Sequence, residues 1–166
     1  MKELNIKVVL LQILGMIFLV NGILQLKFYT VAEKIVWAET HSQYKNSEYW
    51  DKLIPTKEGI YNFWPNVYIW IFLGTLIGIS IMAFVNWKSK LSSLNIILVA
   101  IVLYVLLRLK FFRKEVISEL FRSVRALFSD DFGIQCLIEG ITFTFIGVTI
   151  LYLSVIRIYL NSKKQH

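Results

Sequence analysis

The stretch that decides the fold is residues 65–87, PNVYIWIFLGTLIGISIMAFVNW, which contains no charged residue. An α-helix rises about 1.5 Å per residue, so roughly 20 apolar residues cross the ~30 Å hydrocarbon core of a bilayer. Trp70 and Trp87 lie near its two ends, where aromatic side chains gather in membrane proteins. Residues 65–87 are therefore predicted to form a transmembrane helix.

Three further apolar blocks flank this stretch, at residues 8–27, 91–110 and 132–157. The first is long and lacks the small-residue pair of a cleaved signal peptide, so we interpret it as an uncleaved helix. The last follows Asp130 and Asp131, acids that suit the start of a helix. Each block is continuously apolar rather than alternating, which favours helices over barrel strands. We therefore predict one all-α integral membrane domain with four transmembrane helices.

The composition points to the same class. The chain has 166 residues, 57% of them hydrophobic, against about 45–50% in a soluble protein. Its net charge of +7 comes from residues that lie mostly between the apolar blocks rather than in one stripe. We therefore predict the lipid bilayer as a partner and no nucleic acid. The single cysteine, Cys136, excludes an intrachain disulfide.

The connection at residues 30–64 is polar but rich in Trp and Tyr, unlike a disordered linker. Trp and Tyr prefer the membrane interface, because their rings are apolar and their edges polar. We predict an ordered, aromatic-rich cap on the membrane surface that is partly helical near residues 31–39.

The connection before the last span contains a second surface element at residues 113–128. Apolar residues recur there at helical spacing, and basic residues occupy most of the other face. This pattern predicts an amphipathic helix in the interface, whose cations would contact lipid headgroups. The alternative is a helix that packs on a partner domain. The candidate headgroup ligands are Arg113, Lys114, Arg122 and Arg125.

Glu139 is the most informative single residue, because it is the one charged residue between Phe132 and Ile156 in the fourth block. It lies about two helical turns after Phe132, and an ionisable group at that depth is costly and is a functional-site candidate. It could carry a proton, pair with a cation or bind a polar ligand head. The alternative is a helix that begins near Gly140 and leaves Glu139 at the surface.

Three amides, Gln12, Asn21 and Gln25, lie within the first span. Asn21 and Gln25 are four residues apart and so share one helix face. They could line a polar cavity with Glu139, although hydrogen bonds between neighbouring helices are the simpler interpretation.

Gly74 and Gly78 form a G-x-x-x-G pattern in the second span. Two small residues at this spacing let another helix backbone approach closely. The pattern serves packing within the chain or dimerisation, and it does not distinguish the two.

No sequence motif of an enzyme, a metal site or a phosphate-binding loop occurs, so we predict no metal and no cofactor, and favour a protein that is not an enzyme. Three hypotheses remain. The first is a subunit or interaction protein that packs against membrane partners or itself. The second is a small oligomeric carrier or channel that uses Glu139. The third is a lipid-binding or lipid-modifying protein.

The orientation follows from the placement of Lys and Arg, which favour the cytoplasmic side. The termini and the short turn at residues 88–90 hold fewer of these residues than the two long connections, but at higher density. We predict a protein of the plasma membrane with both termini in the cytoplasm.

Overall fold

The computed structural model describes residues 5–40, 63–88, 94–108, 127 and 129–163. Within these residues the secondary structure is helical and contains no strand. Helices α1, α5 and α8 span Ile6–Tyr29, Phe63–Lys88 and Phe132–Lys163, and each contains a segment long and apolar enough to cross a membrane. The all-helical class is therefore confirmed, and these three helices agree with the spans predicted at 8–27, 65–87 and 132–157.

Helix α6, Leu94–Arg108, is the exception among the predicted spans. Its 15 residues reach about 22 Å, which is less than the ~30 Å of a hydrocarbon core. The span predicted from the sequence was residues 91–110, and residues 89–93 and 109–110 lie outside the described part of the chain. Three helices of membrane-spanning length are thus established, together with one shorter apolar helix.

Both ends of α1 are fixed by local hydrogen bonds. The Asn5 side chain accepts hydrogen bonds from the backbone N–H groups of Lys7 and Val8, which would otherwise lack partners at the helix start. At the other end, the N–H of Thr30 bonds to the carbonyl of Lys27. A short turn then leads into α2, Ala32–Thr40, within the predicted cap. Most of the rest of the cap, residues 41–62, and residues 113–126 of the predicted amphipathic helix lie outside the described residues.

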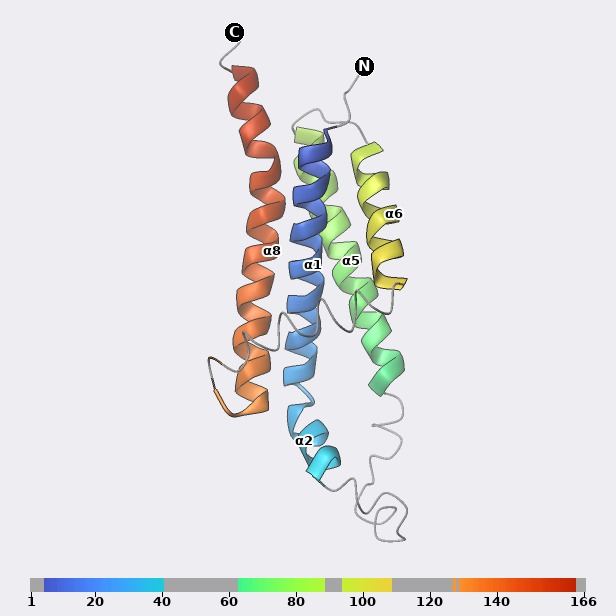
Figure 1. The fold of residues 1–166 in the computed structure, drawn as a ribbon, viewed down its shortest axis with the longest axis vertical. Helices are drawn as coiled ribbons and strands as arrows, with labels where there is room; N and C mark the ends of the chain where they lie inside the picture. The colour runs from blue at the N-terminus through green and yellow to red at the C-terminus, as the bar shows by residue number, and fades with distance from the viewer. Residues whose placement is uncertain (1–4, 41–62, 89–93, 109–126, 128, 164–166) are drawn as a thin grey trace.

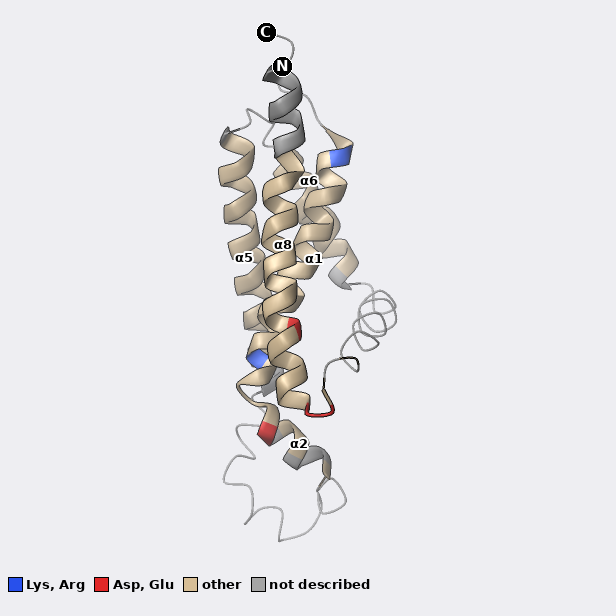
Figure 2. Ribbon diagram, turned by 90° about the vertical axis from the view of Figure 1, so that its left-hand side faces the viewer, with Lys and Arg blue, Asp and Glu red and all other residues tan. Residues whose placement is uncertain are grey.

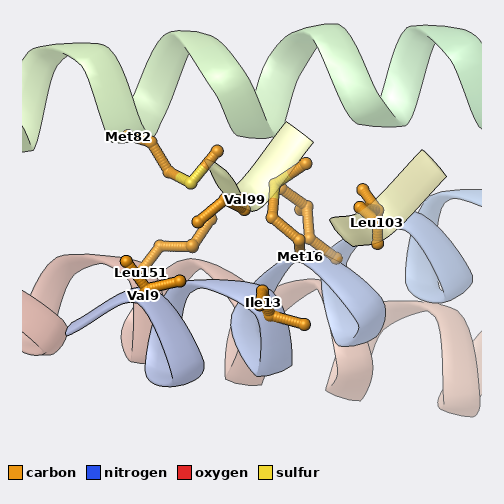
Figure 3. Close-up of a cluster of buried hydrophobic side chains, with 8 residues drawn as sticks. Val9, Ile13, Met16, Met82, Val99, Leu103 and Leu151 are labelled. Carbon is orange, nitrogen blue, oxygen red and sulfur yellow. The ribbon is translucent and has the colours of Figure 1, made fainter. Parts of the chain in front are cut away.

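Helix α1 is the centre of the bundle. It lies between α8 and α6 in Figure 1, with α5 behind it, and its most extensive contacts are with α8. Helices α5 and α8 run antiparallel to α1, and both chain termini lie at the same end. One apolar cluster fills the space between α1, α5, α6 and α8 (Figure 3). Its buried members are Val9, Ile13, Met16, Leu19, Met82, Val99, Leu103 and Leu151.

The outside of the bundle carries many large apolar side chains. Large side chains such as Phe72, Trp87 and Phe145 are 60%, 76% and 73% exposed. Figure 2 shows the middle of the described bundle almost free of charged residues, which lie mainly toward its two ends. Apolar surface of this extent is unusual on a soluble monomer and is the expected surface of a protein in lipid.

Glycines allow α1 and α8 to approach until their backbones touch. A Cβ atom on Gly147 of α8 would lie 2.5 Å from the Leu19 nitrogen and 2.8 Å from the Gly15 oxygen of α1. A Cβ on Gly140 would lie 2.9 Å from the Leu26 nitrogen, and one on Gly22 would overlap Thr144. We call these four glycines, Gly15, Gly22, Gly140 and Gly147, the α1–α8 seam. The seven-residue spacing on both helices keeps them on facing sides.

Gly74 and Gly78 of α5 also face the inside of the bundle. A Cβ on Gly74 would lie 3.3 Å from the Cα of Val20, and one on Gly78 would overlap the Met16 side chain. The G-x-x-x-G pattern therefore packs α5 onto α1 in this structure, which is the intrachain alternative.

Candidate functional site

Glu139 lies in the interior of the bundle. Helix α8 begins at Phe132, and its first turn is capped by the Asp131 carboxylate, which accepts a hydrogen bond of 2.8 Å from the Ile134 nitrogen. The alternative of a helix that begins near Gly140 is therefore not the observed one. Glu139 follows two helical turns later and is 3% exposed. Its carboxyl group is thus shielded by other helices.

Asn21 of α1 is a direct partner of this carboxyl group. Its side-chain nitrogen donates a hydrogen bond of 3.3 Å to Oε1 of Glu139, which links α1 to α8. Lys27 lies six residues beyond Asn21, with its Nζ 5.5 Å from the centre of the Trp70 ring. Lys and Trp favour the membrane interface. Asn21 therefore lies about 9 Å inside the level of Lys27, and Glu139 reaches it from a level between the two residues.

Gln25 is the second amide near this level. It is 5% exposed, and its side-chain oxygen finds no hydrogen-bond donor in the described part of the chain. Leu26 packs against Gly140 and Leu19 against Gly147, and this antiparallel register puts Gln25 at the level of Glu139. Asn21 and Gln25 share one face of α1, one turn apart. The Glu139 carboxyl group and the two amides therefore lie at neighbouring levels of the α1–α8 pair, which we call the Glu139 layer.

Apolar and weakly polar groups enclose the Glu139 layer. On the side toward the bundle centre, Phe18 and Phe143 form an edge-to-face pair, with ring centres 5.4 Å apart. On the other side, the thiol of Cys136 is fully buried one turn before Glu139. This arrangement shields the carboxyl group from bulk water and allows few hydrogen bonds, so each of those bonds matters more.

Gln12 does not belong to this layer. It lies nine residues from Asn21, about 13 Å along α1. It pairs with Asn86 of α5 through two amide hydrogen bonds of 2.7 and 3.5 Å, and both residues are buried. The apolar cluster around Met16 and Leu19 separates Gln12 from Glu139, and the Gln12–Asn86 bonds agree with the alternative of hydrogen bonds between neighbouring helices.

Two buried amides were not singled out from the sequence. Asn86 stands beside Trp87 at the end of a span, where a polar residue is unremarkable. Asn95 is fully buried near the start of α6 and accepts a bond of 3.4 Å from the Asn5 nitrogen. An amide inside an uncharged apolar block is the signal that would have identified both.

An open groove of about 730 Å³ lies at the end of the bundle where α2 meets α8. Tyr29, Thr30 and Glu33 line one side, and Asp131 and Gly133 line the other. Gly133 lies six residues, or about 9 Å, from Glu139. The groove thus adjoins the end of the bundle nearer to the Glu139 layer.

The remaining candidates concern metal and lipid. In the residues that the structure describes, no group of three His, Cys, Asp or Glu side chains could hold a metal ion. The proposed headgroup ligands Arg113, Lys114, Arg122 and Arg125 lie outside the described residues.

No protein-family model matches the chain, and neither a curated protein nor a solved structure matches it. Function is therefore inferred from the geometry of the site.

Proposed function

We propose that this protein is a small membrane carrier or channel subunit that binds a proton or a cation at Glu139. One observation carries the proposal: an acidic side chain that is 3% exposed and hydrogen-bonded by Asn21 within a span of membrane length. Ionisable groups at such depth are expensive and mark ion or proton pathways in membrane proteins. A packing role alone would be served equally well by an uncharged residue.

The packing of the bundle indicates where a pathway would run. The centre around α1 is filled by large side chains such as Met16, Met82 and Leu151. A route through the middle of one chain is therefore disfavoured, and the flank of the α1–α8 pair, where Asn21 is half-buried, is the better candidate. We propose that several copies, or a partner, complete the pathway at this flank.

The finer topology belongs to the same proposal. We propose that α6 is the fourth span of a four-helix bundle, extended by Arg108 and Lys110, whose stems lie in lipid and whose charges reach the surface. We further propose an interfacial helix at residues 113–128, a location in the plasma membrane and cytoplasmic termini. The position of both termini at one end of the bundle supports an even number of crossings (Figure 1).

The test is ion flux in liposomes that contain the purified protein. The wild-type protein should dissipate an imposed proton or sodium gradient, and Glu139→Gln should lower that flux at least tenfold. Gln12→Leu is the matched control, because it alters a buried amide of α1 outside the Glu139 layer. Tight liposomes with the wild-type protein, or full flux with Glu139→Gln, would reject the proposal.

A second candidate function, a subunit that packs against membrane partners, is favoured by a different observation. Leu10, Leu11 and Leu14 on α1 are 61%, 44% and 44% exposed, so part of the central helix is uncovered in the described bundle. Purification in mild detergent should then yield a stoichiometric partner or a defined homo-oligomer. A monomer at all concentrations would count against this function.

A further inference from the structure

The side-chain oxygen of Gln25 raises a specific question about the Glu139 layer. This oxygen is buried and accepts no hydrogen bond from the described residues. A buried amide oxygen without a donor loses the hydrogen bond that water would have given it, which costs about 1–3 kcal/mol. A donor at the level of Gln25 would remove this cost.

An ionised Glu139 cannot supply that donor, because a carboxylate only accepts hydrogen bonds. A protonated carboxyl group has one O–H donor and a carbonyl acceptor. We propose that Glu139 holds a proton in the folded bundle and donates it in a hydrogen bond to the Gln25 oxygen. The inference rests on the proposed function, since it names the proton as the species that the site binds.

Asn21 fits the same arrangement. Its N–H group donates to Oε1 of Glu139, which becomes the carbonyl oxygen of the acid, and the second oxygen carries the proton toward Gln25. The carboxylate takes up one proton from water, and its charge changes from −1 to 0 without a change in any other bond. A neutral acid is also far less costly to bury than a carboxylate.

The described surroundings are consistent with a neutral acid. On α8 the nearest titratable group is the buried Cys136 thiol, and the acids Asp130 and Asp131 lie beyond the helix start. On α1 the nearest cation, Lys27, lies over the ring of Trp70. Helix α5 presents no acid or base between Val67 and Trp87 apart from Tyr68, which is exposed.

Infrared difference spectroscopy of the protein in lipid nanodiscs at neutral pH tests this inference. The spectrum of the wild-type protein minus that of Glu139→Gln should contain the carbonyl band of a protonated carboxylic acid. Gln25→Leu should shift this band to higher frequency, because the acid loses its hydrogen-bond acceptor. Gln12→Leu, the matched amide control, should leave the band in place.

The possible results separate this inference from the proposed function. Absence of the acid band, with carboxylate bands instead, would overturn the proton assignment, and a sodium-sensitive carboxylate signal would point to a metal cation. An acid band that Gln25→Leu does not move would exclude Gln25 as the acceptor. If Glu139→Gln abolishes flux and the wild-type spectrum has no acid band, the carrier or channel function is supported and a protonated Glu139 is rejected. An acid band without flux would support a protonated Glu139 and reject the carrier or channel function.

Discussion

At the scale of single residues, the polar side chains of α1 have two different roles. Asn21 donates a hydrogen bond to Glu139 and Gln25 lies at a neighbouring level, whereas Gln12 joins Asn86 in a closed pair of amides. The sequence identified Gln12, Asn21, Gln25 and Glu139 as candidate site or hydrogen-bonding residues, because polar residues are rare in apolar spans. It could not predict their partners, since these depend on which helices are neighbours and on their register.

The Gln12–Asn86 pair should contribute to stability without affecting flux. Gln12→Leu leaves the Asn86 amide without its partner and should lower the free energy of unfolding by about 0.5–2 kcal/mol. The double variant Gln12→Leu/Asn86→Leu should lose less than the sum of the two single variants. Unfolding of the purified protein in mixed micelles measures this, and strict additivity would show that the two amides do not interact.

At the scale of helices, the seam between α1 and α8 explains why Glu139 meets the amides of α1. The backbones touch at Gly15, Gly22, Gly140 and Gly147, and this contact fixes the register. The four-residue spacing of Gly74 and Gly78 is evident in the sequence, whereas the seven-residue spacing on α1 and α8 was not predicted from it. Two glycines in each of two distant helices form a motif only when the helices are known to be paired.

Glycine substitutions should distinguish the α1–α8 contact from the α1–α5 contact by their effect on stability. Gly147→Ala should destabilise the protein by about 1–3 kcal/mol, because the new methyl group would overlap the backbone at Leu19. Gly74→Ala is the matched control, since its Cβ would lie 3.3 Å from the Val20 Cα, and alanine favours a helix by about 1 kcal/mol over glycine. Thermal aggregation in detergent measures both, and equal losses would contradict the seam.

The residues at which the helices begin were predicted more accurately than the pairs of helices that pack together. Charges and caps mark these ends in the sequence, and α1, α5 and α8 begin within about two residues of the predicted spans. Helix α6 is described over Leu94–Arg108, and the other residues of the predicted span 91–110 lie outside the described residues, so this span stays a prediction.

At the scale of the whole molecule, the arrangement of the helices predicts which segments share a side of the membrane. Both termini lie at one end, and the start of α8 lies at the other (Figure 1). In a variant with Cys136→Ser, cysteines at Ser129 and Ser162 should therefore label from opposite sides of sealed vesicles, with Ser162→Cys on the cytoplasmic side. Labelling of both from one side would contradict the arrangement of α8.

A carboxyl group at membrane depth requires lipid around the bundle at the level of Glu139, and the accessibility of Ile141 to water tests this directly. Ile141 lies two residues from Glu139 but is 58% exposed on the outside of the described bundle, so the other described helices do not shield it fully. In the Cys136→Ser background, Ile141→Cys should resist a water-soluble maleimide from both sides of sealed vesicles and react after denaturation in SDS. Rapid labelling of Ile141→Cys in intact vesicles would contradict a carboxyl group at membrane depth.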